Sequence, residues 1–243
     1  MSMQLKKEHL EYLSPFFKGK EGVLGSAKRQ RFESIEALID AHFREFSEPQ
    51  HICRSSISAA ISKLMRRPAV IVETGSAAWG TKSSLLFDSY VNSFGGEFLS
   101  VDIRVEPMWT LSRQCTSNSR LFCDDSVQFL GSRFSDQRID LCYLDSFDLD
   151  LSNPLPAMIH GLHEFLCVLP SLRRYGGLLL IDDTPSDPTY FGKQGETQWN
   201  QCIGNFGIPP GKGSLIIDFL ERHQYATLVC HSYQVLYEFA PTI

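Results

Sequence analysis

Short apolar runs alternate with amphipathic segments from residue 69 onward, and this alternation predicts the fold class. Brief runs bounded by turn residues are typical of buried strands, whereas apolar residues three or four positions apart are typical of helices. Strands are expected at 69–73, 97–103, 120–123, 139–145, 178–182, 226–231 and 234–239, and helices at about 85–91, 108–118, 127–131, 156–172 and 213–223. This alternation predicts an α/β fold with a doubly wound, mostly parallel sheet. The last two strands are close enough to form a C-terminal antiparallel hairpin at one edge.

The regions outside this alternation indicate an extension and a lid. Residues 1–30 are polar, and residues 31–67 have helical spacing that ends before Pro68. We therefore expect an N-terminal arm and helical extension over 1–67, followed by a Rossmann-like domain over 68–243. Within that domain, residues 184–212 are rich in Pro, Gly, Asn and Thr with little periodicity, which predicts a functional loop or lid.

The composition favours a cytoplasmic protein with no nucleic-acid or membrane partner. With 23 basic and 28 acidic residues, the net charge of −5 gives no general attraction to nucleic acid or acidic lipid. The seven cysteines are scattered without a C-x-x-C pair, which indicates reduced thiols and argues against a zinc site. The first residues lack the apolar core of a signal peptide, and no apolar stretch approaches the roughly 20 residues needed to cross a bilayer. The sequence is compatible with a homodimer.

A glycine-bearing turn follows the first of these predicted strands. The stretch AVIVETGSAAWGTKSS contains an acid, Glu73, then Gly75 and Gly80, and leads into a helical segment. Dinucleotide binders, P-loop NTPases and methyltransferases that use S-adenosylmethionine (SAM) all share this outline. Lys82 nearly completes a P-loop, but Thr81 separates it from Gly80 and shifts its ammonium away from a phosphate cradle. A nucleotide-binding kinase or NTPase is therefore the alternative rather than the first interpretation.

Acidic residues stand at the ends of five predicted strands. They are expected at one edge of the sheet, where ligands bind in such folds, and they comprise Glu73, Asp102, the pair Asp124 and Asp125, Asp145, and the pair Asp182 and Asp183. Asp102 follows Gly80 by 22 residues, the separation at which an acid accepts hydrogen bonds from a ribose. Carboxylates without a cysteine or histidine cluster suit a hard cation such as Mg²⁺, and Asp145, Asp182 and Asp183 are the candidates.

These motifs resemble, in order, those of the class I SAM-dependent methyltransferases. The series is ETGSAAWGTKSS, SVDI, CDDSVQFL, DLCYLDS and GGLLLIDD, and its acid triple is similar to the metal site of catechol and of macrolide and sugar O-methyltransferases. The resemblance implies SAM and Mg²⁺ or another divalent cation as cofactors. Metal ligands would be Asp145, Asp182 and Asp183, and cofactor contacts would be Glu73, Thr74, Gly75, Ser76, Gly80, Ser83, Asp102, Ile103, Asp125, Ser126 and Asp145.

Two departures from the family pattern shape the expected activity. The glycine turn is one residue longer than usual, with Trp79 before Gly80, and Asp148 replaces the lysine that serves as base in catechol methyltransferases. We therefore expect O-methylation of a sugar or secondary-metabolite hydroxyl, as in natural product biosynthesis, rather than of a catechol. Asp148 is the first candidate base and His160 the second. Another metal-dependent activity on this fold is a further alternative.

Overall fold

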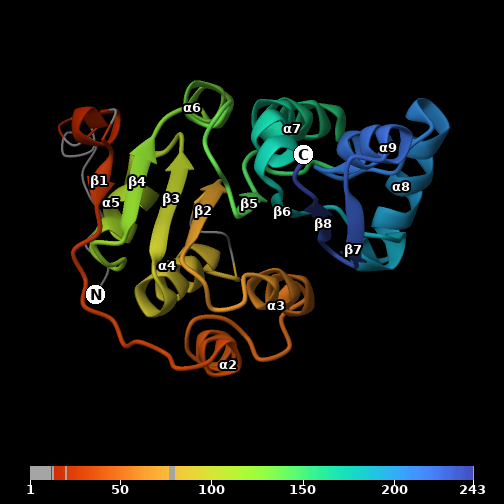
Figure 1. Ribbon diagram of the computed structural model, residues 1–243. Helices are drawn as coiled ribbons and strands as arrows, with labels where there is room; N and C mark the ends of the chain where they lie inside the picture. The colour runs from red at the N-terminus through yellow and green to blue at the C-terminus, as the bar shows by residue number, and fades with distance from the viewer. Residues whose placement is uncertain (1–11, 13, 20, 77–79, 243) are drawn as a thin grey trace.

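The computed structural model describes residues 12, 14–19, 21–76 and 80–242, and an eight-stranded sheet forms its centre (Figure 1). The strand order is β1-β4-β3-β2-β5-β6-β8-β7. The strands are β1 Val23–Leu24, β2 Ala69–Thr74, β3 Gly96–Asp102, β4 Ser119–Cys123, β5 Leu141–Leu144, β6 Gly177–Ile181, β7 Thr227–His231 and β8 Val235–Phe239. The described helices are α2 Ile35–Glu45, α3 Arg54–Lys63, α4 Ser83–Phe94, α5 Val105–Ser112, α6 Ser126–Arg133, α7 Leu155–Tyr175, α8 Gly192–Phe206 and α9 Ser214–His223, with the 3-10 turn η1 Pro188–Phe191.

The two faces of the sheet are buried by different helices. Successive strand residues point to opposite faces, so Leu178 and Leu180 pack with α2, α3 and α4, whereas Leu179 and Ile181 pack with α6, α7 and α9. Because both faces are covered, β5 and β6 are apolar along their whole length rather than alternating. The predicted doubly wound Rossmann-like architecture is therefore confirmed.

The order in which successive strands are added to the sheet reverses between β2 and β5. Strands β2, β3 and β4 are parallel neighbours that proceed outward on one side, and β5 and β6 proceed outward on the other. In an open sheet, this switch point leaves a crevice at the carboxyl ends of the strands. The predicted hairpin is also present, because β8 pairs antiparallel with both β6 and β7.

Besides the short 3-10 turn η1, two of the described elements were not expected from the sequence. Residues 184–212 contain helix α8 instead of being a loop throughout. Its apolar residues, Trp199, Cys202, Ile203 and Phe206, do have helical spacing, but glycines and polar residues dilute the signal. The second element is β1, which pairs antiparallel with β4 within the expected polar arm and has only two residues. The inserted Trp79 lies outside the described residues.

Helix α7 corrects the expectation that no segment could cross a bilayer. It has 21 residues and is long and apolar enough to do so by length and composition alone. The same composition is found in helices packed against a core, and α7 buries Met158, Phe165, Val168 and Leu172. One such helix is weak evidence for a membrane span.

Candidate active site

A cleft of about 820 Å³ opens at the switch point, at the carboxyl ends of the five strands β2 to β6. It brings together eleven residues that the sequence singled out: Gly75, Ser76, Asp102, Ile103, Asp125, Ser126, Asp145, Asp148, His160, Asp182 and Asp183. Its lining also includes residues outside that prediction, namely Val101, Arg104, Ser146, Phe147, Lys212 and Tyr233. Four predicted cofactor contacts, Glu73, Thr74, Gly80 and Ser83, do not line it.

Gly75 allows β2 and β5 to approach closely at the floor of the cleft. Its φ is +76°, and a Cβ at this position would lie 2.3 Å from the carbonyl oxygen of Asp145. Only glycine fits a site with both a left-handed backbone and no room for a side chain. The turn after β2 therefore packs directly on the turn after β5, and Gly75 lines the cleft at the point where the first strand ends.

Glu73 lies beneath the turn rather than in the cleft. Its side chain is fully buried, and its carboxylate accepts hydrogen bonds from Ser83 at 2.6 Å, Ser84 at 2.5 Å and Ser100 at 2.7 Å. Burial raises the pKa of Glu73 to about 7, although the three serine hydroxyls oppose the rise. Glu73 thus ties the strand end to the start of α4, and the hydroxyls of Ser83 and Ser84 are turned toward it.

The N-terminal extension holds the other end of the turn. The Nε2 atom of His42 lies 2.7 Å from the Thr81 carbonyl oxygen, and the Ser47 hydroxyl donates to the Gly80 carbonyl at 2.5 Å. Burial lowers the pKa of His42 to about 4, so the ring is neutral near pH 7. Because a carbonyl can only accept, the proton is on Nε2. Helix α2 and the segment after it therefore belong to the scaffold of the site.

Asp102 lies at the end of β3, and Arg104 covers it. Only 3% of the Asp102 side chain is exposed, against 65% of the Arg104 side chain. Arg104 donates from Nε to Oδ1 at 2.9 Å and from Nη2 to Oδ2 at 2.7 Å, and the backbone N–H of Ser76 donates to Oδ2 at 3.1 Å. Between these two residues, Ile103 has 74% of its surface exposed and gives the cleft an apolar wall.

His160 connects the first residue of α6, Ser126, to the residues that follow β5. Its Nε2 atom lies 3.0 Å from the hydroxyl of Ser126 and 2.9 Å from that of Ser146, and Ser146 donates to Glu164 at 2.6 Å. The hydrogen bond with Glu164 is the main factor that raises the pKa of His160. Asp125 caps α6 by accepting from the Gln128 N–H at 2.9 Å. The sequence-predicted His160 is thus part of a polar network, and Asp148 is exposed beside it.

The three predicted metal ligands lie together, but Lys212 lies between them. Its Nζ atom is 2.9 Å from Oδ1 of Asp145 and 3.0 Å from Oδ2 of Asp183. Burial by itself would lower the pKa of Lys212, but the negative charges of Asp145, Asp183 and Asp182 outweigh it and raise the pKa. The lysine is therefore a buried ammonium with 4% of its side chain exposed.

This arrangement does not fit a divalent cation. The ammonium of Lys212 occupies the space between two of the three carboxylates, and both oxygens of Asp182 already accept hydrogen bonds, from Tyr143 at 2.9 Å and from Gln234 at 2.8 Å. Among the residues that the structure describes, no group of three or more His, Cys, Asp or Glu side chains is arranged to hold a metal ion.

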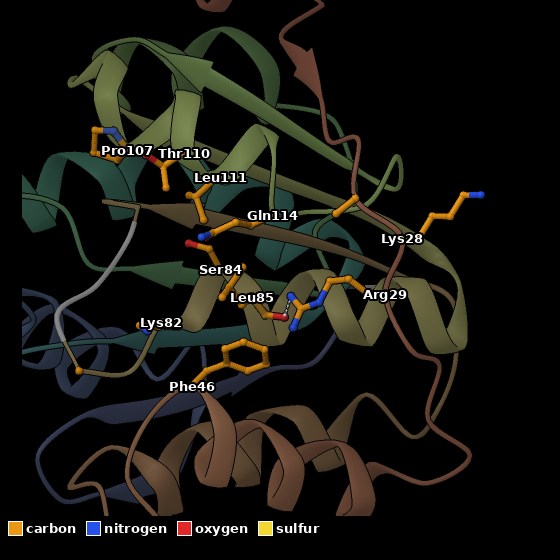
Figure 2. A pocket seen from close by; sticks show the side chains of 12 residues that line it. Lys28, Arg29, Phe46, Lys82, Ser84, Leu85, Pro107, Thr110, Leu111 and Gln114 are labelled. Carbon is orange, nitrogen blue, oxygen red and sulfur yellow. Dashed lines mark hydrogen bonds between the residues drawn. The ribbon is translucent and has the colours of Figure 1, made fainter. Parts of the chain in front are cut away.

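A second cavity, of about 630 Å³, lies between the N-terminal segment, α4 and α5 (Figure 2). Phe46, Leu85 and Leu111 give it an apolar surface, and Lys82 lies at its edge. Arg29 donates to the Leu85 carbonyl at 3.0 Å within it. None of the strand-end acids lines this cavity, so the chemistry predicted from the sequence belongs to the cleft.

Comparisons with solved structures agree with this architecture. MycE, a methyltransferase of the mycinamycin biosynthetic pathway solved with Mg and S-adenosylhomocysteine (SAH), superposes with a TM-score of 0.57 at 16% sequence identity. The match covers 87% of this chain and 56% of MycE, so the chain corresponds to about half of that protein. MycE has also been solved with Mg, SAH and mycinamycin VI, with the same similarity.

Two further methyltransferases match over nearly their whole length. The SAH-bound enzyme of Podospora anserina has 11% identity and a TM-score of 0.47, covering 99% of each chain. One from Geobacter sulfurreducens has 12% identity and a TM-score of 0.47, covering 98% of each. No protein-family model matches the sequence, and no curated protein sequence matches it. The chain has the fold of class I SAM-dependent methyltransferases, as the motif series predicted.

Proposed function

We propose that this protein is a SAM-dependent methyltransferase that methylates a hydroxyl group of a small molecule. The observation that carries the proposal is the cleft at the switch point, where Gly75, Asp102, Asp125 and Asp145 converge from four strands. These are the positions at which the ordered motifs place the cofactor-binding residues. The fold shared with MycE supports the same assignment.

The cleft has the size and the surfaces that SAM requires. Ligand sites commonly measure about 300–1,000 Å³, and the cleft of about 820 Å³ lies within that range. Asp102 would accept hydrogen bonds from the ribose once Arg104 moves aside, and exposed Ile103 would pack against the adenine. Asp125 and Ser126, which line the same cleft, would lie at the edge of the base. Gly75 and Ser76 would present their backbone to the methionine end.

The charge of the cleft favours a cationic cofactor over a phosphate. Asp145, Asp182 and Asp183 carry more negative charge than the single ammonium of Lys212 can balance, and Glu73 lies directly beneath the turn. A sulfonium would be attracted to this surface and a triphosphate repelled. The hydroxyls of Ser83 and Ser84, which would face phosphate or its metal in a P-loop, point to Glu73 instead.

The chemistry needs an acceptor held in line and a group that takes its proton. SAM supplies a methyl group on a sulfonium; the acceptor oxygen bonds to it as the carbon–sulfur bond breaks, and the electron pair remains on sulfur. Asp148, exposed in the cleft lining, is our candidate for the base. His160 would orient Ser126 and Ser146 through its Nε2 contacts. Tyr233 and the acids offer partners to a hydroxyl-rich acceptor, such as a sugar or a secondary metabolite.

Calorimetric titration of SAH, with ATP as the comparator, tests the proposal. We expect saturable SAH binding and none for ATP. Asp102→Asn should weaken SAH binding by about ten-fold or more, because a charged acceptor for the ribose is lost. Asp136→Asn is the matched control, since Asp136 is a surface acid with 70% of its side chain exposed. Tight ATP binding without SAH binding would refute the assignment.

A further inference from the structure

Lys212 is held in the cleft by its backbone as well as by its side chain. Its N–H donates to the carbonyl of Asp183 at 3.0 Å, and the next residue, Gly213, donates to the Thr184 hydroxyl at 2.8 Å. On the other side, α7 approaches its carbonyl so closely that a Cβ at Gly161 would lie 2.5 Å from the Lys212 oxygen. The position of Lys212 is therefore fixed between the end of β6 and α7.

The ammonium of Lys212 has a full set of acceptors. It donates to the Asp145 carbonyl at 3.2 Å and to the Asp145 carboxylate at 2.9 Å, and it pairs with Asp183 at 3.0 Å. An ammonium has three N–H groups, so all three are used by these two acids. The ammonium is therefore a positive point charge surrounded by oxygen atoms, as a bound metal cation would be.

Three of the remaining oxygens of the acid cluster, one of Asp183 and both of Asp182, are also paired. Tyr233 donates to Oδ1 of Asp183 at 2.5 Å, and Asp182 accepts from Tyr143 and Gln234. Gln234 is fully buried and its own carbonyl oxygen accepts from Ser56 at 2.5 Å, so its orientation is fixed. Lys212 is the cation in a polar cluster whose carboxylates accept from neutral donors of β5 and the hairpin, and Ser56 of α3 holds one of those donors, Gln234, in place.

We propose that Lys212 takes the place of a divalent metal ion in this site, and that its ammonium holds Asp145 and Asp183 in position so that the protein works without a bound metal. Lys212 is a positioning residue, since the acids use all three of its N–H groups. The part of Lys212 in methyl transfer rests on the proposed function. The placement of Lys212 in the cation site is independent of that function, because it follows from the contacts of the acid cluster.

Binding of Mn²⁺, followed by electron paramagnetic resonance of the free ion, tests the proposal. Wild-type protein should show no site with a Kd below about 1 mM, whereas Lys212→Ala, which frees oxygens of Asp145 and Asp183, should bind Mn²⁺ with a Kd of roughly 10–100 µM. The matched control is Lys63→Ala. Lys63 pairs with Glu238 at 2.7 Å on the surface, and its loss should create no Mn²⁺ site.

Three results would overturn the proposal. The first is micromolar Mn²⁺ binding by the wild type that Asp182→Asn abolishes. The second is a folded Lys212→Ala protein that gains no Mn²⁺ site, and the third is a gain of equal size in Lys63→Ala. Lys212→Met, which keeps the aliphatic stem, is measured in parallel. If neither Lys212→Ala nor Lys212→Met folds, the Mn²⁺ titration of the wild-type protein tests the proposal by itself.

SAH titrations on the same samples separate this proposal from the proposed function. A wild type that binds SAH but not Mn²⁺ supports both. A wild type that binds neither SAH nor Mn²⁺ refutes the methyltransferase assignment but still agrees with the proposal that Lys212 occupies the cation site. One that binds SAH together with Mn²⁺ at the acid cluster refutes only the role of Lys212.

Discussion

Glu73 should make the stability of this protein fall as the pH rises, and Glu73→Gln isolates the effect. The carboxylate is fully buried, and its pKa rises from 4.5 to about 7. Between these two values the folded state keeps the proton that the unfolded chain has released, so stability decreases with rising pH. At about 1.4 kcal/mol per pKa unit, the loss amounts to about 3 kcal/mol.

His42 has the opposite pH dependence and would mask this loss in the wild type. Its pKa is lowered to about 4 in the folded state, so between that value and 6.5 the unfolded chain binds the extra proton. Stability from His42 therefore increases with pH over nearly the same window. Glutamine at position 73 cannot ionise, and His42 is present in both proteins. The difference between the two proteins therefore reports Glu73 alone.

Urea denaturation at several pH values between 4.5 and about 8 measures this difference. The free energy of unfolding of the wild type, minus that of Glu73→Gln, should fall by about 3 kcal/mol across the range. Glu45→Gln, at a site with 53% of the side chain exposed, should leave the profile parallel to that of the wild type. If Glu73→Gln is also parallel within about 1 kcal/mol, the buried carboxylate is not what the structure indicates.

Three further substitutions probe the cleft. Lys212→Met should lower the free energy of unfolding by about 3–5 kcal/mol, since it leaves buried carboxylates without their cation. Lys63→Met on the surface should lower it by less than about 1 kcal/mol. Urea denaturation measures both values. Gly161→Ala should destabilise by about 1–3 kcal/mol by forcing a Cβ to 2.5 Å from the Lys212 carbonyl. Gly204→Ala, with open space around its Cβ, should stabilise α8 by up to about 1 kcal/mol in the same assay. Arg104→Ala should tighten SAH binding by up to about five-fold in calorimetry, because the exposed arginine competes weakly for Asp102; weaker binding would mean that Arg104 contacts the ligand.

Local patterns in the sequence were enough to predict the layered architecture and the edge of the sheet that carries the site. Apolar runs such as 69–72 and 178–181 can be recognised locally, and such a run is enough to predict a strand that is buried on both faces. The acids at the strand ends could also be identified locally, because parallel strands bring their carboxyl ends to one edge. The dilute periodicity of α8, by contrast, was too weak to distinguish a helix from a loop.

The tertiary structure decided which of those acids face the cleft and what they meet there. Glu73 accepts from Ser100, which is 27 residues away, and so it lies under the turn rather than beside a ligand. Lys212 meets Asp145 across 67 residues of chain. In the sequence, the only local sign of this lysine was its place between two glycines, Gly211 and Gly213. No local pattern encodes a contact between segments so far apart, because the ammonium reaches the carboxylates only where the backbone of residues 212–213 lies between α7 and the turn after β6.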